Sequence, residues 1–218
     1  MHLHFLNTEE YQFSQNEQAK IAKITENAYG EAKHLLPMLS EQLNITVQPS
    51  DRVIPETGEA AMAVHKDLLN LNINPDFEKG IDWVVDRHVY ATVFHEAHHC
   101  ARYKKYPEEE SLLGNAVMEG LASVFERDYA EHPPLWSDYS RVPIQEWTEE
   151  LLAHKDETDF DYGSWFFFSS DDRRWIGYRV GTYIVDQALA NHTTDTPATL
   201  VHASPGDIVE MAGKTDRQ

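Results

Sequence analysis

Two histidines separated by three residues, with a glutamate directly after the first, are the part of the sequence best suited to chemistry. They are His95, Glu96 and His99 in the segment HEAHH. In a helix, positions i and i+4 lie on one face, so both imidazoles can bind the same metal ion. The glutamate at i+1 projects beside them, where it can accept a proton from a metal-activated water. The spacing predicts a metal site with Glu96 as the general base.

A third metal ligand is predicted at Glu119, twenty positions after His99. Its neighbours 117–118 and 121–125 are mostly apolar, and an ionised carboxylate on an apolar helix is costly unless a cation lies beside it. The acidic residues 108–110 fall in a polar loop and are weaker candidates. Gly120 is small, so we expect this helix to approach the His95 helix closely. A boundary glutamate that reaches solvent is the alternative interpretation of Glu119.

The elements that must position these residues follow from hydrophobic periodicity and turn signals. Strict alternation of leucine or isoleucine with asparagine over residues 69–74 is typical of a half-buried strand. We expect helices over 9–43 (broken near Pro37), 77–103, 111–129, 143–154 and 172–190, a short helix after 192, and strands over 44–48, 61–64 and 69–74.

The fold class predicted from this order is α+β. An N-terminal helix, a small mixed or antiparallel sheet and the HExxH helix form a lobe over residues 1–105. A mainly helical lobe follows over residues 106–218, and both lobes belong to a single domain over residues 1–218. The composition agrees with a folded chain, because 41% of its residues are hydrophobic and 11% are aromatic.

The sequence resembles the gluzincins, zinc metallopeptidases in which a glutamate on a second helix completes the HExxH ligand set. It is also similar to a family of predicted bacterial zinc-dependent proteases of unknown substrate. That resemblance covers roughly residues 60–190 and is carried by HEAHH, by EGLA at 119–122 and by GYRVG at 177–181. It implies a zincin-like fold, one Zn²⁺ per chain, and a peptide or protein substrate.

The resemblance also implies a group that stabilises the oxyanion of the transition state, supplied by the last long helix. Tyr178 is the first candidate, and Arg174, at the i, i+4 position on the same expected helix, is the second. An ordinary packing role for Tyr178 remains an alternative. In zincins an edge strand pairs with an extended substrate, and residues 69–74 are our candidate for that strand.

Other residues near the motif have plainer interpretations. His98 points about 100° away from His99 around the helix, so it is expected to be exposed or to contact a metal ligand without binding the metal itself. Cys100 is interpreted as a small buried residue, and the aromatic run 166–168 as core in preference to a substrate pocket. Asp82 and Asp86 are hypothetical hydrogen-bond partners of a ligand imidazole.

The charge balance makes two classes of partner unfavourable. There are 18 Lys and Arg against 37 Asp and Glu, a net charge of -19, which disfavours nucleic acid and anionic membrane surfaces. With a single cysteine, no intrachain disulfide can form. The N-terminal segment lacks a basic region followed by an apolar run, which predicts a cytoplasmic location.

These observations together predict a zinc-dependent metallopeptidase, a hydrolase. Two alternatives stay open. The first is a metal-binding protein for partner interaction or a chaperone-like role, without hydrolytic activity; the intact Glu96 argues against it, because a structural site needs no general base. The second is hydrolysis of a non-peptide amide. The sequence does not predict the oligomeric state.

Overall fold

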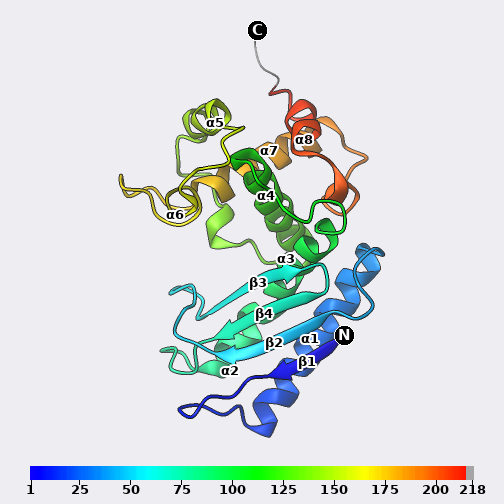
Figure 1. Cartoon of the computed structure of the whole chain (residues 1–218), viewed down its shortest axis with the longest axis vertical. Coiled ribbons are helices and arrows are strands. Elements are labelled where there is room, and N and C mark those ends of the chain that lie inside the picture. The colour runs from blue at the N-terminus through cyan, green and yellow to red at the C-terminus, as the bar shows by residue number, and fades with distance from the viewer. Residues whose placement is uncertain (215–218) are drawn as a thin grey trace. The chain divides into compact units, whose positions relative to one another are not determined.

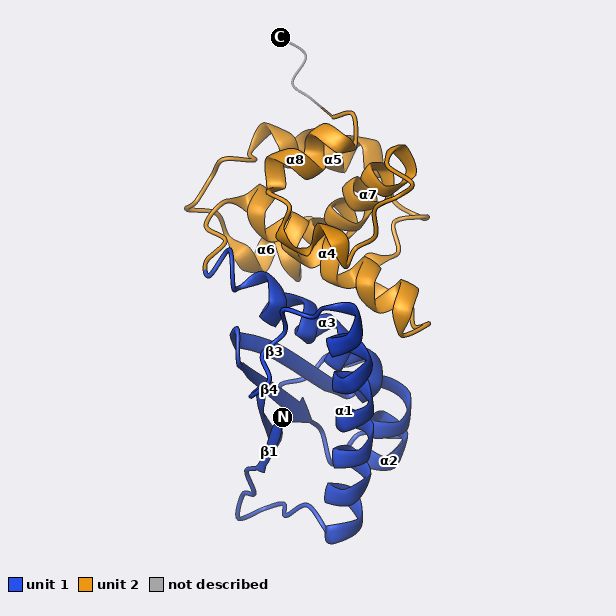
Figure 2. Cartoon of the chain, turned by 90° about the vertical axis from the view of Figure 1, so that its right-hand side faces the viewer, with its two compact units in different colours: residues 1–107 blue, residues 108–218 orange. Residues whose placement is uncertain are grey.

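The structure is a computed structural model that describes residues 1–214 of the 218-residue chain. The chain divides into two compact units, Met1–Pro107 and Glu108–Gln218 (Figure 2). The first holds a sheet and helices and the second is mostly helical, so the predicted α+β class is confirmed. Whether the units act as a single domain stays a prediction. None of the described helices is both long enough and apolar enough to cross a bilayer.

One mixed sheet is the framework of the first unit. Its strands are β1 (His2–Phe5), β2 (Asn44–Pro49), β3 (Glu59–His65) and β4 (Leu68–Ile73). Within the described residues they lie in the order β1-β2-β4-β3 (Figure 1). β1, β2 and β4 are parallel, and β3 runs antiparallel to β4. β1 has only four residues and is not among the predicted strands.

The sheet is apolar on one face and polar on the other. On the polar face, side chains of β2 and β4 are linked across the ladder. Thr46 Oγ1 donates to Asn70 Oδ1 at 2.7 Å, and Gln48 Nε2 donates to Asn72 Oδ1 at 2.7 Å. The predicted alternation in β4 is therefore confirmed. The opposite face is fully buried and carries Ile45, Val47, Leu69, Leu71 and Ile73.

β4 lies inside the sheet and not at its edge. It pairs with β2 on one side and with β3 on the other, so both rows of its backbone groups are engaged. The prediction that residues 69–74 form an edge strand for a peptide is therefore wrong. β3 and β4 form a hairpin, and β4 inserts between β3 and β2, which leaves β3 at the edge.

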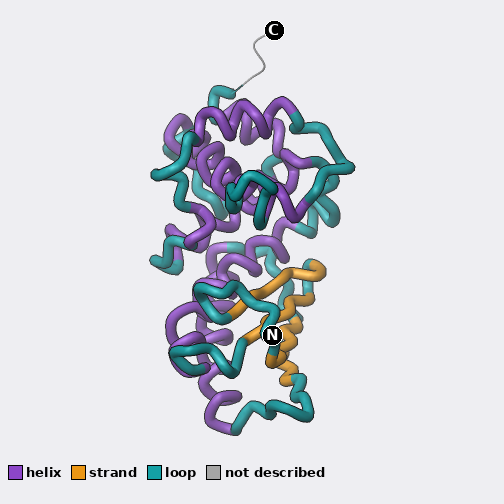
Figure 3. Tube along the Cα trace, turned by 90° about the vertical axis from the view of Figure 1, so that its left-hand side faces the viewer, coloured by secondary structure: helices purple, strands orange, loops and turns teal. Residues whose placement is uncertain are grey.

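The helices of this unit lie on one side of the sheet (Figure 3). α3 contacts β3 and β4 and also packs against α1. The predicted helix over 77–103 begins later, at Ile81, and contains a π-helical turn. The helical elements are α1 (Gln15–Leu35), α2 (Ile81–Val84), the π turn η1 (Val85–Val89) and α3 (Tyr90–Arg102).

α1 is shorter than the helix predicted over 9–43. Ser14 caps its start: the Ser14 side chain accepts from the Glu17 backbone N–H, and the Glu17 side chain accepts from the Ser14 N–H. This capping box fixes the first turn, so the preceding residues stay outside the helix. The helix ends at Leu35, two residues before Pro37, because the residue before a proline disfavours the helical conformation.

Two helices form the centre of the second unit. α4 and α7 cross where two glycines meet: a Cβ on Gly120 would lie 2.2 Å from the Gly181 carbonyl carbon, and a Cβ on Gly181 would lie 1.8 Å from the Ala116 carbonyl oxygen. Gly120 thus faces α7, which corrects the expectation that it faces the His95 helix. The helical elements are α4 (Leu112–Tyr129), η2 (Leu135–Ser137), α5 (Ile144–Ala153), α6 (Tyr162–Phe166), α7 (Ile176–Asn191), η3 (Thr199–His202) and α8 (Pro205–Met211).

α7 begins four residues later than predicted. A bridge between Phe168 and Arg174 closes a short turn before it. Asp172 and Trp175 both have positive φ (64° and 58°), and Trp175 is the residue that precedes the first helical turn. Arg174 therefore lies outside the helix. The predicted i, i+4 relation of Arg174 and Tyr178 on one helix is wrong.

Candidate metal centre

The two histidines of the motif lie one turn apart on α3. His95 and His99 are 5% and 4% exposed, and their ring centroids are 4.8 Å apart. The remaining surface of the helix is packed, so the backbone that carries the imidazoles is held in place. The buried apolar residues of α3 are Ala91, Val93, Phe94, Ala97, Cys100 and Ala101.

A π-helical turn comes directly before α3. Such turns are rare and often occur at functional sites, because the extra residue changes which side chains face a common direction. The two aspartates before and within this turn are not hydrogen-bond partners of the histidines, contrary to the prediction from the sequence. Asp82 and Asp86 are both exposed and both bind Lys20 Nζ, at 2.8 and 2.7 Å. The hypothesis that these aspartates orient a ligand imidazole is therefore wrong.

Glu96 is tied to the sheet. Its Oε2 accepts a hydrogen bond of 2.6 Å from the backbone N–H of Ala63 in β3, and its side chain is buried. A hydrogen bond to an ionised carboxylate is stronger than one between neutral groups. It holds the carboxylate in a fixed direction relative to α3. The general base predicted from the sequence is therefore a buried, anchored carboxylate.

Glu119 lies in the middle of α4 and is 5% exposed. Met118 and Leu121, close to it in the sequence, are also buried, so Glu119 lies on an apolar part of the helix as predicted. The hydroxyl of Tyr162 on α6 donates to Glu119 Oε1 at 3.5 Å. The interpretation of Glu119 as a glutamate that reaches solvent is wrong.

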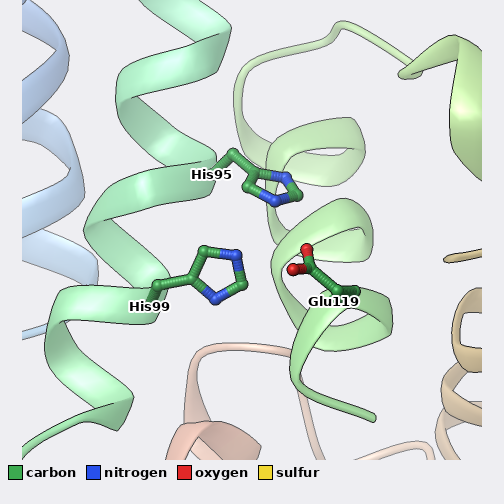
Figure 4. A group of neighbouring side chains, drawn as sticks. All are labelled: His95, His99 and Glu119. Carbon is green, nitrogen blue, oxygen red and sulfur yellow. The ribbon is translucent and has the colours of Figure 1, made fainter. Parts of the chain in front are cut away.

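His95, His99 and Glu119 form one group of potential metal ligands. Each offers one ligand atom, and these atoms all lie within 4.8 Å of one another. In Figure 4 both imidazoles project from α3 toward the Glu119 carboxylate. Two imidazole nitrogens and one carboxylate oxygen are a donor set that zinc accepts in catalytic sites, with one coordination position left for a water or substrate. The residues present therefore fit one zinc ion, which would also offset the cost of burying the carboxylate.

Tyr178 and Arg174, the two candidates to donate a hydrogen bond to the oxyanion, both contact aromatic rings. The Arg174 guanidinium lies over Trp175, 3.9 Å from the ring centroid, and over Phe168 at 4.7 Å. The Tyr178 ring is 5.7 Å from Phe166 in an edge-to-face contact. Their roles in catalysis stay predictions.

His98 and Cys100 are both buried, which was predicted only for Cys100. His98 is fully buried, so the alternative of an exposed side chain is wrong, and the alternative of a contact with a metal ligand stays a prediction. Cys100 is buried as predicted, and its thiol donates to the His65 carbonyl at 3.4 Å. Burial raises the pKa of the Cys100 thiol above its usual range, and the charge of Glu96 adds to this effect. The thiol stays protonated and does not act as a nucleophile at neutral pH.

The aromatic run 166–168 divides between the core and the surface. Phe166 is fully buried, as the prediction of a core role requires, and a Cβ on Gly177 would lie 2.3 Å from its ring. Phe167 and Phe168 are 52% and 57% exposed, so the prediction of core packing is wrong for them.

Two contacts at the site could not be found from the sequence. The Ala63 N–H is a backbone group that no side-chain pattern identifies. Tyr162 lies 43 residues from Glu119, in a segment rich in aromatic residues that gives no metal-site signal. The sequence does mark the start of the short helix that carries Tyr162, because Asp161 accepts from the Ser164 N–H as an N-cap.

Comparison with known proteins identifies a family. The sequence model of the family described as "Predicted Zn-dependent protease (DUF2268)" matches residues 18–210. No curated protein and no solved structure matches the chain.

Proposed function

Since the chain belongs to this family of predicted Zn-dependent proteases, we propose that it is a zinc-dependent metallopeptidase of the gluzincin type. In the proposal His95, His99 and Glu119 hold one zinc ion per chain, and Glu96 is the general base. The observation that carries it is the buried group of His95, His99 and Glu119, in which both imidazoles come from the same helical motif as the anchored Glu96. A purely structural site would not need the general base.

A zinc ion bound by three protein ligands makes a water molecule acidic near neutral pH and polarises a carbonyl group. Glu96 accepts the proton of the attacking water and delivers it to the nitrogen of the leaving amine. The hydrogen bond from the Ala63 N–H supports this role, because it keeps the carboxylate from rotating away during proton transfer. Tyr178 is the first candidate to donate a hydrogen bond to the oxyanion, and Arg174 is the second.

The peptide substrate is proposed to add to β3 as an extra strand, in place of the interior strand β4. In an antiparallel pair, alternate residues direct both backbone groups toward the partner strand. The Gly58 carbonyl accepts from the Asn74 N–H, whereas the Glu59 carbonyl accepts from Ile54 on the other side. By this alternation Ala61 directs its N–H and carbonyl away from β4, where an extended peptide can pair with them.

Backbone amide exchange tests this docking mode. We expect a peptide bound to an inactive Glu96→Gln variant to slow exchange of the Ala61 amide. The Met62 amide, which faces β4, is the internal control and should not change. Equal exchange at Ala61 with and without a bound peptide would exclude pairing along β3.

The metal content of the purified protein tests the proposed function itself. We expect about one zinc per wild-type chain by elemental analysis after dialysis, and almost none in Glu119→Ala. Glu149→Ala is the matched control, because Glu149 is an exposed glutamate of α5 and should leave the zinc content unchanged. Circular dichroism establishes that each variant is folded. A wild-type protein that binds no zinc from an excess would overturn the proposal.

A further inference from the structure

The hydroxyl of Tyr162 reaches the carboxylate of Glu119. It donates to Oε1 at 3.5 Å, and Tyr162 is 37% exposed whereas Glu119 is 5% exposed. A tyrosine at the surface thus contacts a buried carboxylate with its polar end. Hydrogen bonds at functional sites are often long before the ligand binds and shorten in the complex.

Tyr162 is held in this position by its own short helix. Its ring stacks on Phe166, with centroids 4.4 Å apart and planes 16° from parallel, and Phe166 is fully buried in the core of the second unit. Asp161 caps the start of α6 by accepting from the Ser164 N–H, and Asp161 Oδ2 also accepts from Ser164 Oγ at 2.7 Å. The ring is therefore fixed independently of its contact with Glu119.

We propose that Tyr162 is a positioning residue for the metal ligand Glu119. The inference rests on the proposed function, because it requires Glu119 to bind the metal. Each hydrogen bond to a carboxylate oxygen limits rotation about the last side-chain bond, and the bond from Tyr162 does so at Oε1 of Glu119 before the metal arrives. Hydrogen-bond partners of ligand side chains commonly contribute about 10- to 100-fold to metal affinity. Tyr162 acts through Glu119 and not on the substrate.

The alternative is that Tyr162 serves only to pack α6 onto the core. The two roles depend on different atoms of the side chain. Stacking on Phe166 uses the ring, whereas positioning of Glu119 uses the hydroxyl. Tyr162→Phe removes the hydroxyl and keeps the ring, so it separates the two roles.

The test is the zinc affinity of Tyr162→Phe, measured by competition with a chromophoric chelator at fixed pH. We expect the zinc dissociation constant to rise by about 10- to 100-fold over wild type. The thermal midpoint of the metal-free protein should stay unchanged, because the ring contacts remain. Tyr129→Phe is the control. Tyr129 lies on α4, the helix that carries Glu119, and its ring centroid is 5.0 Å from that of Phe125. Loss of the Tyr129 hydroxyl should not alter the zinc affinity.

Two results would overturn the inference while leaving the zinc site in place. One is a dissociation constant for Tyr162→Phe within about threefold of wild type; the measured ratio then lies well below the expected range. The other is an equal loss of affinity in Tyr129→Phe, because the effect would then not depend on contact with Glu119. A wild-type protein without zinc affinity would overturn the proposed function, and this inference with it, so the two failures are distinguishable.

Discussion

At the scale of single residues, Glu96 is the side chain whose role can be separated from metal binding. Glu96→Gln keeps an amide oxygen that can accept from the Ala63 N–H, so the local structure should persist. The amide cannot accept the proton of water. We expect the zinc content to equal that of wild type and cleavage of a peptide library to fall by about 10²- to 10⁴-fold.

The control for this variant is Glu149→Gln, which makes the same chemical change on an exposed face of α5. The Glu149→Gln protein should cleave the peptide library at the wild-type rate. A Glu96→Gln protein that keeps zinc and cleaves peptides at the wild-type rate would exclude Glu96 as the general base. Loss of zinc in Glu96→Gln would mean instead that this carboxylate also supports the metal site.

The sequence predicted the part of the site that depends on local spacing. His95 and His99 come together because of one helical turn, and the apolar neighbours of Glu119 identified a buried carboxylate on a helix. The Ala63 N–H and Tyr162 could not be predicted as parts of the site. Ala63 lies 33 residues from its partner Glu96, and Tyr162 lies 43 residues from its partner Glu119, so tertiary packing brings each pair together. The assignment of His95, His99 and Glu119 as zinc ligands stays a prediction until metal is measured.

At the scale of elements, the contact between α4 and α7 depends on the absence of a side chain at Gly181. A Cβ there would lie 1.8 Å from the Ala116 carbonyl oxygen, so Gly181→Ala must push the two helices apart. Overpacking of this kind costs about 1–3 kcal/mol in the free energy of unfolding. We expect a lower thermal midpoint, by about 2–4 °C for each kcal/mol lost.

Gly30→Ala is the matched control in another helix. A Cβ on Gly30 in α1 would meet nothing within 4 Å, and the residue is exposed. Alanine is favoured over glycine inside a helix by about 0.5–1 kcal/mol, so this variant should raise the thermal midpoint. A stable Gly181→Ala protein, no different from Gly30→Ala, would mean that α4 and α7 can separate without cost.

Elements were predicted well where their own residues determine them and poorly where tertiary contacts do. The ends of α4 and α5 fall within about two residues of the prediction, which is the usual uncertainty of helix ends. α7 begins late because the Phe168–Arg174 bridge and the left-handed Trp175 extend the preceding turn. The position of β4 inside the sheet depends on pairing with β2, and no pattern within residues 69–74 encodes that order.

At the scale of the whole molecule, the composition and the order of elements were sufficient to predict the fold class. A helix, a few alternating strands and then a succession of helices exclude both a doubly wound α/β fold and an all-β sandwich. The two compact units divide at residue 107, two residues after the boundary expected from the sequence. Composition carries no comparable information on the substrate of the proposed peptidase, because substrate choice depends on a few side chains placed by packing.

Metal binding should also be visible in the stability of the whole chain. A ligand that binds only the native state stabilises it by about 2.7 kcal/mol at 100 times its dissociation constant. We therefore expect zinc to raise the thermal midpoint of the wild-type protein and a chelator to lower it again. The single cysteine leaves no intrachain disulfide to obscure this effect.

The 12 histidines could bind zinc in the unfolded chain as well and reduce the stabilisation. Glu119→Ala corrects for this, because it keeps every histidine and changes only the native site. The difference in zinc-induced midpoint shift between wild type and Glu119→Ala thus reports native binding alone. Equal shifts in the two proteins would mean that zinc binds elsewhere on the chain, and His95, His99 and Glu119 would then not be the ligands.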